Sequence, residues 1–312
     1  SDVIAGAAAA REANADLLIA FGGGSVIDAT KLIQLCLWAD ITEVDQLAPY
    51  RMGRGDDRKD AARISSGVRM IAIPTTLSAA EFTPFAGVTD GEKQVKESYT
   101  HPDFAPRAVI LDPAITLDTP ARLWSSTGMK AIDHAVEQLC NLERSPMGDA
   151  VAAEGLRLLA KGLRATHDDP ADLEARAACQ HGMWLAISGA ATGRGMGASH
   201  AIGHTLGGSY GVPHGITSCI TLHATLEWNR DYSVDRQTLV SRLMGKRALP
   251  AADVVRDLVK TLGLPWRLSE LLLGGSHFRA IAEHTMHDRG IRTNPRPIRS
   301  ADDIVEILEL CA

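Results

Sequence analysis

The sequence lacks any run rich in lysine and arginine. Lys and Arg together number 32 against 38 Asp and Glu, which leaves the 312 residues with a net charge of −6. Without a basic segment, the chain has no electrostatic footprint for nucleic acid or for an anionic membrane surface. We therefore expect a small-molecule partner, and neither nucleic acid nor a membrane.

Cysteine is scarce, and no two cysteines have the spacing of a CxxC pair. The five are Cys36, Cys140, Cys179, Cys219 and Cys311. An odd number without such a pair is typical of reduced thiols in a cytoplasmic protein, so we expect small core residues and a cytoplasmic location. The longest stretch free of charged residues, 195–226, contains four histidines and Pro213 and therefore cannot be a membrane-spanning helix.

The periodicity of apolar residues divides the chain into two parts. The first alternates a helix over 3–14, a strand over 17–21, a helix from 25, and strands over 69–74 and 107–112, with an exposed segment at 48–67. After about residue 120 the strand patterns end, and helices are predicted over 121–141, 148–165, 171–192, 216–228, 250–262 and 300–311. We place the boundary at 115–120, with an α/β domain over 1–117 and an all-helical domain over 118–312.

A glycine turn joins the first predicted strand to its helix. It consists of Gly22, Gly23, Gly24 and Ser25. Consecutive glycines let the backbone approach an anion, and the helix N-terminus presents unpaired N–H groups, so the turn suits a pyrophosphate. A plain tight turn explains the residues equally well, because the GxGxxG fingerprint is absent. Thr75 and Thr76 end the next strand, where open α/β sheets bind ligands, and favour a nucleotide site.

Four histidines in the second part have spacings that could bring them to one site. They are His134, His200, His204 and His214. His200 and His204 are four residues apart and share one face of a helix, and His214 follows after a glycine-rich turn. Such a cluster could converge on a cation or a substrate, although each histidine alone could be a capping or hydrogen-bonded core residue.

Six segments, in this order, resemble the iron-containing alcohol dehydrogenase superfamily. They are AFGGGSVIDATK (20–31), IPTTLSAAEFTPFAGVTD (73–90), VILDP (109–113), GMKAIDHAVE (128–137), HAIGHTLGGSYGVPHG (200–215) and NPRPI (294–298). HTLGG and NPRPI are most similar to the maleylacetate reductase branch. The resemblance implies a Rossmann-like dinucleotide-binding α/β domain followed by a helical domain, the architecture also found in dehydroquinate synthase, with the active site between them.

The resemblance also implies how a nicotinamide cofactor, NAD(H) or NADP(H), is bound. The GGGS turn would bind its pyrophosphate, Thr75 and Thr76 would lie along its nicotinamide side, and Lys96 in a following β-hairpin would contact it. We include Asp28, in the helix after the turn, among the cofactor-binding residues. Family members begin several tens of residues upstream, with the unit that selects NAD over NADP, so we expect the chain to be truncated at its start.

Metal-binding relatives use an Asp, a His four residues later, and two histidines fourteen apart. His134, His200 and His214 match these histidines and would hold Fe or Zn, while His204 matches a histidine near the reacting carbonyl. Lys130 stands where the Asp is expected, and its ammonium would repel a divalent ion.

Asp133 is a poor substitute for that Asp, because on a helix it points about 100° away from His134. The maleylacetate reductase branch also lacks the Asp and works without metal. Lys130 therefore fits a metal-free site in which the ammonium and the histidines polarise a substrate oxygen, and a solvent-facing lysine is the alternative.

These features predict an NAD(P)-dependent reductase or dehydrogenase that transfers a hydride between nicotinamide and a carbonyl or conjugated enone. Lys130 and the histidines would stabilise oxyanion charge, and His204 or His200 would relay the proton. The alternatives are a metal-dependent alcohol dehydrogenase, a dehydroquinate synthase-like lyase, and an inactive binding protein. We expect a homodimer. Arg194, Arg292 and Arg296 could recognise a substrate carboxylate.

Overall fold

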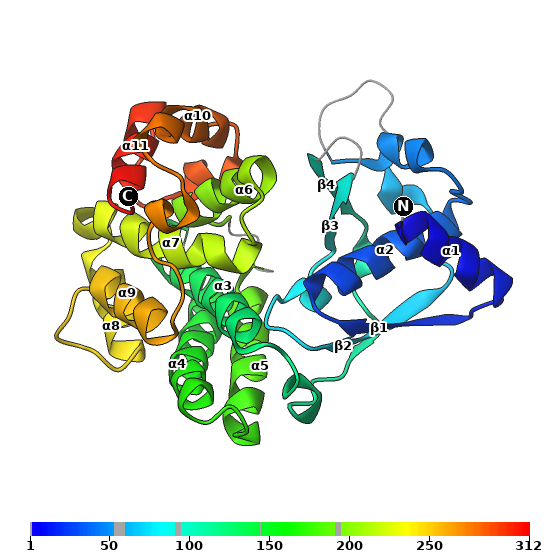
Figure 1. Cartoon of the computed structure of the whole chain (residues 1–312), viewed down its shortest axis with the longest axis horizontal. Coiled ribbons are helices and arrows are strands. Elements are labelled where there is room, and N and C mark those ends of the chain that lie inside the picture. Colours follow the sequence, from blue (N-terminus) through cyan, green and yellow to red (C-terminus); the bar gives the residue numbers. More distant parts are fainter. Residues whose placement is uncertain (1, 53–59, 91–94, 144, 191–194) are drawn as a thin grey trace. The chain divides into compact units, whose positions relative to one another are not determined.

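The structure divides the chain near the end of the predicted strands. The computed structural model describes residues 2–52, 60–90, 95–143, 145–190 and 195–312 (Figure 1). The units are Ser1–Thr116 and Leu117–Ala312, a division inside the 115–120 window given by the loss of strand patterns. Among the described residues, no helix combines the length and the apolar character needed to cross a membrane.

A small parallel sheet organises the first unit. Its helices and strands are α1 (Asp2–Glu12), β1 (Leu17–Gly22), α2 (Gly24–Trp38), β2 (Arg69–Pro74), β3 (Phe85–Asp90), β4 (Val95–Thr100) and β5 (Ala108–Val109). The sheet has the order β1-β2-β5, with β1 and β2 in register from Leu17 opposite Arg69 to Gly22 opposite Pro74. The strand expected over 107–112 is reduced to two residues. The α/β character of the first part is therefore confirmed, with a smaller sheet than the sequence suggests.

An antiparallel hairpin and short 3-10 helices complete this unit. The hairpin pairs β3 with β4, from Phe85 opposite Thr100 to Asp90 opposite Val95. The 3-10 helices are η1 (Val44–Tyr50), η2 (Ala61–Arg63), η3 (Ala80–Phe82), η4 (Pro102–Phe104) and η5 (Ala114–Thr116). Leu47 and Ala61 are buried in the apolar cluster around Leu32 and Leu35 of α2. The segment 48–67, predicted to be an exposed excursion, is thus anchored near both of its ends by apolar packing.

A buried lysine ties α2 to the segment before β3. Lys31 is 0% exposed, and its Nζ donates to the carbonyl oxygens of Ala80 at 2.6 Å, Thr83 at 3.0 Å and Phe85 at 2.6 Å. It also lies 3.6 Å from the Asp28 carboxylate. Because its donors are satisfied by carbonyl oxygens and a carboxylate, the buried charge is tolerated and holds this segment in place.

Glu81 lies in the same buried region. It is 1% exposed, and neither carboxylate oxygen has a hydrogen-bond partner in another residue among those described. Burial raises the pKa of Glu81 to about 7, because the opposing effects of its own backbone N–H and of the Lys31 charge are smaller. This carboxyl therefore gives up its proton near neutral pH.

The second unit is helical, as expected. Its helices are α3 (Ala121–Cys140), α4 (Pro146–Asp168), α5 (Leu173–Ser188), α6 (Ala198–Tyr210), α7 (His214–Trp228), α8 (Val234–Leu243), α9 (Ala251–Thr261), α10 (Gly275–Thr285) and α11 (Ala301–Glu309), with 3-10 helices η7 (Arg230–Tyr232), η8 (Leu268–Leu271) and η9 (Arg289–Thr293). The six predicted helices correspond to α3, α4, α5, α7, α9 and α11. The full extent of α6, and the helices α8 and α10, were not predicted.

The five cysteines are all buried, which confirms them as core residues. Burial raises the pKa of the Cys36 thiol to about 11 and that of the Cys179 and Cys311 thiols to about 12. These thiols are therefore poor nucleophiles at neutral pH.

Glycines allow α4 and α5 to pack closely. A Cβ on Gly155 would lie 2.8 Å from the backbone nitrogen of Ala186 and 2.8 Å from the carbonyl oxygen of Gly182, and backbone atoms cannot turn aside. We expect Gly155→Ala to lower the free energy of unfolding by about 2 kcal/mol through overpacking. Urea denaturation measures the change. Gly275→Ala is the matched control, because a Cβ there meets nothing within 4 Å, and equal stability of the two variants would contradict the packing argument.

Candidate active site

In the first unit, the two predicted cofactor segments lie at the ends of neighbouring strands. Gly22 ends β1 opposite Pro74, and the Thr75 N–H donates to the Gly22 carbonyl oxygen at 3.0 Å. The glycine turn and the threonine pair therefore meet at the carboxyl edge of the parallel sheet, the edge at which open α/β sheets bind ligands.

The start of α2 is shaped for a phosphate. Gly23 is its N-cap and makes no side-chain capping bond. A Cβ on Gly23 would lie 3.0 Å from the Thr76 methyl carbon, and one on Gly24 would lie 2.8 Å from the Ser78 hydroxyl. The Thr76 hydroxyl oxygen is buried and has no partner among the described residues. A helix N-terminus without a side-chain cap, next to a hydroxyl without a partner, fits a pyrophosphate oxygen.

The structure gives less information on the two further residues expected at the cofactor, Asp28 and Lys96. The Asp28 carboxylate accepts the Gly87 N–H at 3.0 Å and faces Lys31, so in this unit it fastens β3 to α2. Lys96 lies in β4 opposite Thr89, and its side chain is outside the described part of the structure.

In the second unit, α3 presents a buried polar stripe. Lys130, Asp133, His134 and Glu137 follow the spacing of one helix face, and none is more than 7% exposed. The Lys130 Nζ lies 3.9 Å from the Asp133 carboxylate. Such a stripe in the interior of a unit must be neutralised and hydrogen-bonded from the helices opposite it.

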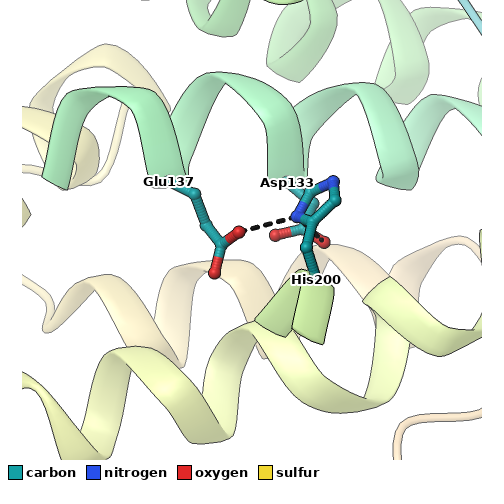
Figure 2. A group of neighbouring side chains, drawn as sticks. All are labelled: Asp133, Glu137 and His200. Atoms are coloured by element: carbon teal, nitrogen blue, oxygen red, sulfur yellow. Dashed lines mark hydrogen bonds and ion pairs between the residues drawn. The ribbon is translucent and has the colours of Figure 1, made fainter. Parts of the chain in front are cut away.

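Glu137 binds the start of α6 and one of its histidines. Its carboxylate accepts the backbone N–H groups of Gly197 and Ser199, both at 2.8 Å, and His200 Nδ1 lies 2.6 Å from Oε2 (Figure 2). Because a carboxylate only accepts, Nδ1 carries the hydrogen in this bond. The other ring nitrogen, Nε2, is buried without a partner among the described residues and points away from Glu137.

Asp133 accepts from both α6 and α7. Its Oδ2 receives the Ser218 hydroxyl at 2.6 Å and the Ser199 hydroxyl at 3.1 Å, and His200 Nδ1 lies 3.3 Å away. Asp133 therefore does contact the histidine cluster, through a histidine other than His134. It points away from His134 along the helix, but toward His200, which comes from the opposing helix.

The charges of this cluster are set by its neighbours. Burial alone would raise the pKa of Asp133, but the His200 imidazole, followed by Lys130, holds it below its usual range. Burial works against a charged His200, yet the Asp133 carboxylate keeps its pKa above the usual value. Burial, and then the charges of His200 and Lys130, hold the pKa of His134 well below its usual value, so His134 is neutral. The charges of His200 and Asp133 therefore stabilise each other inside this cluster.

The four predicted histidines form a ladder of ring contacts. The rings of His134 and His200 stack with centroids 5.0 Å apart, His200 meets His204 edge-on at 6.2 Å, and His204 stacks on His214 at 5.7 Å. His134 and His200 are buried, whereas His204 and His214 are exposed. The ladder therefore runs from the buried stripe to the surface of the unit.

The buried cluster contains three side chains of the kinds that bind metal ions. Among the described residues, Asp133, Glu137 and His200 bring one ligand atom each within 4.8 Å of one another, whereas His134, His200 and His214 do not form such a group. The carboxylate oxygens already accept N–H and hydroxyl donors, and the Lys130 ammonium lies beside Asp133. A divalent ion about 4 Å from an ammonium is opposed by several kcal/mol even at an effective dielectric constant of about 20. With Lys130 charged, these residues do not fit the ion.

The arginines considered for a substrate carboxylate have separate positions. The Arg296 guanidinium stacks 3.8 Å over the Trp228 ring and lies 3.2 Å from the Glu306 carboxylate. The preceding Asn294 exchanges side-chain hydrogen bonds with Asn229 at 2.8 and 2.9 Å. This part of the NPRPI segment therefore fastens the unit together. Arg292 is exposed, and Arg194 is outside the described residues.

Sequence reasoning missed Glu137, Ser199, Ser218 and Asp288 as members of the site. A signal was present for Glu137, because it lies seven residues after Lys130 and so on the same helix face. Asp288, whose Oδ2 lies 2.8 Å from His204 Nδ1, is 84 residues away in sequence and gave no local signal.

Comparison with known proteins gives a consistent result. Residues 1–113 match iron-containing alcohol dehydrogenase, and residues 125–311 match the C-terminal domain of the Fe-containing alcohol dehydrogenase family. The dehydrogenase FUM7 of Gibberella moniliformis is 32% identical over 97% of this chain and 78% of its own length. A maleylacetate reductase of Burkholderia cepacia is 31% identical over 80% of this chain and 68% of its own.

A solved structure agrees with these matches. Maleylacetate reductase from Rhizobium sp. strain MTP-10005 superimposes with a TM-score of 0.79 at 29% identity, covering 99% of this chain and 77% of its own. The named relatives are dehydrogenases and reductases, so the chain is an oxidoreductase, which favours this class over the lyase and the inactive binding protein. With matches to both of its units, the chain belongs to the iron-containing alcohol dehydrogenase family, near its maleylacetate reductase branch.

Proposed function

We propose that this chain is a maleylacetate reductase-like, NAD(P)H-dependent reductase of a carbonyl or of an enone conjugated to one, and that its site works without a metal ion. The observation that carries the proposal is the buried Lys130, which stands beside Asp133 on the stripe that faces the histidines. A fixed cation in a poorly solvated site stabilises negative charge that develops on a substrate oxygen.

Lys130 and the histidines would have separate roles in the reaction. Lys130, with the neutral His134 next to it, would polarise the oxygen as it becomes an oxyanion. His200 is held by Glu137 and Asp133, so its Nε2 is the nitrogen left for a ligand. His204, at the exposed part of the ladder, would exchange the required proton with solvent. In this scheme the buried end of the ladder stabilises the oxyanion, and a histidine of its exposed part supplies the proton.

The first unit supports the cofactor half of the proposal. The N-terminus of α2, with the Thr76 hydroxyl beside Gly23, would hold the pyrophosphate of NAD(H) or NADP(H). The bound nicotinamide supplies the hydride. Expected binding residues in this unit are the GGGS turn and the two threonines.

A metal-dependent alcohol dehydrogenase is the second candidate. It is favoured by the grouping of Asp133, Glu137 and His200, and iron is the metal for which the family is named. This candidate requires the Lys130 side chain to be neutral or displaced, since its charge opposes the ion.

Elemental analysis combined with activity assays tests the proposal. We expect the purified protein to contain no stoichiometric Fe or Zn, and to oxidise NADH or NADPH with maleylacetate equally well with and without chelator. Simple aldehydes should be poor substrates. Stoichiometric metal together with chelator-sensitive aldehyde reduction would overturn the metal-free site in favour of the second candidate.

A further inference from the structure

An aspartate outside the predicted site contacts His204, an exposed histidine of the ladder. Asp288 Oδ2 lies 2.8 Å from His204 Nδ1, and their side chains are 25% and 53% exposed. An ion pair this exposed usually contributes little to the stability of a fold.

The aspartate is held in a defined orientation. Its second oxygen, Oδ1, accepts the Gly290 N–H at 2.7 Å and thereby caps η9. Its own N–H donates to the Thr285 carbonyl at 2.9 Å, and the Thr285 hydroxyl donates to the Thr205 hydroxyl of α6 at 3.0 Å. One oxygen is therefore fixed by the backbone, and the other is presented to the imidazole.

The far side of η9 is also fixed against the start of α6. The Thr293 hydroxyl donates to the Met196 carbonyl at 2.5 Å, and a Cβ on Gly290 would lie 3.0 Å from the Gly197 carbonyl oxygen. Asp288 and His204 therefore belong to segments that are joined at two separate points. This rigidity distinguishes the pair from a surface ion pair made by two mobile side chains.

The carboxylate selects one form of the imidazole. Burial raises the pKa of Asp288, but the hydrogen bond and charge of His204 outweigh it and hold the pKa below its usual range, so the group is an acceptor. His204 must then carry hydrogen on Nδ1, which leaves Nε2 as the nitrogen that can face a substrate.

We propose that Asp288 is a positioning residue that fixes the ring orientation and the Nδ1–H tautomer of His204 for proton transfer at Nε2. The inference rests on the proposed function, in which His204 exchanges the proton of the reduction. Asp288 itself touches no reacting atom in this scheme. It acts as carboxylates do that orient catalytic or ligating imidazoles.

The test combines a spectroscopic and a kinetic measurement on Asp288→Asn. In protein labelled with 15N-histidine, long-range 1H–15N spectra should show His204 as the Nδ1–H tautomer, with its signals assigned by their loss in His204→Gln. We expect Asp288→Asn to populate the Nε2–H tautomer and to lower kcat by about 10- to 100-fold, with KM changed much less.

A matched control and the contrary outcomes complete the test. Asp302→Asn removes an exposed carboxylate 2.7 Å from Arg279 and should change neither the tautomer nor kcat. An unchanged tautomer in Asp288→Asn overturns the proposal, and so does an unchanged kcat when the tautomer shifts. If the wild-type chain reduces none of the tested carbonyl compounds, the proposed function fails, while the tautomer measurement still decides whether Asp288 fixes the ring.

Discussion

Lys130→Met is expected to lower kcat for maleylacetate reduction by about 100- to 1000-fold, the usual cost of removing one preorganised donor to an oxyanion. Methionine preserves much of the side-chain volume but removes the charge beside Asp133. KM should change far less than kcat, because the charge on the substrate oxygen develops only in the transition state. Steady-state kinetics with the preferred nicotinamide cofactor measures both constants.

Lys161→Met is the matched control for this experiment. Lys161 is exposed on α4, so the same change there should leave kcat unchanged. Circular dichroism establishes that both variants are folded. A rise confined to KM in Lys130→Met would mean that the ammonium binds the substrate and the transition state equally. If both kcat and KM were unchanged, Lys130 would have no part in the mechanism.

A second substitution of Lys130, to the aspartate expected in metal-binding relatives, separates the two candidate functions. Lys130→Asp removes the ammonium that opposes a divalent ion and adds a carboxylate next to the histidines. We expect this variant to retain Fe or Zn after dialysis where the wild-type protein does not, as measured by elemental analysis. Metal in both proteins would instead show that the wild-type site tolerates Lys130.

The second large effect concerns the pH dependence of stability in the first unit. With a pKa of about 7 in the folded chain against an ordinary value of 4.5, Glu81 remains protonated in the folded unit where an unfolded chain would ionise it. Relative to the ionised form, the protonated Glu81 carboxyl stabilises the folded unit. This stabilisation is complete below pH 4.5 and is lost as the pH rises through about 7. The difference corresponds to about 3 kcal/mol by proton linkage.

Glu81→Gln should remove this part of the pH dependence, because an amide does not titrate. The variant should gain about 3 kcal/mol relative to wild type between pH 4.5 and pH 8. Hydrogen exchange of peptides from β2 and η3 reads the first unit separately from the second. Glu12→Gln, on the exposed end of α1, is the control. Equal pH profiles of protection for wild type and Glu81→Gln would mean that the folded unit does not hold this carboxyl protonated.

Local patterns predicted much of the site, and long-range contacts did not emerge from them. The spacing of Lys130 and His134, and of His200 and His204, places each pair on one helix face. In the structure the rings of the four histidines contact one another, each ring touching the next. The same spacing rule places Glu137, seven residues after Lys130, on that helix face. The contact of Asp288 with His204 depends on how η9 packs against α6, which no local pattern encodes.

The missed elements have comparable causes. The glycine-rich α6 and the polar α8 show weak apolar periodicity, so burial by neighbouring helices defines them more than their own sequence does. The helix α10 is as amphipathic as α3, so its own pattern could have predicted it. The buried charges of the first unit are also long-range features. Lys31 reaches carbonyl oxygens about fifty residues away, and nothing near it in sequence distinguishes it from a surface lysine.

Glu137 limits how this site can diversify. One carboxylate both caps the start of α6 and orients His200. A substitution that removes its hydrogen bond to the His200 ring therefore also leaves the N–H groups of Gly197 and Ser199 without an acceptor. Variation at the buried end therefore carries a folding penalty with every change of chemistry. New substrate preferences should arise instead by replacement of the exposed residues around His204 and His214.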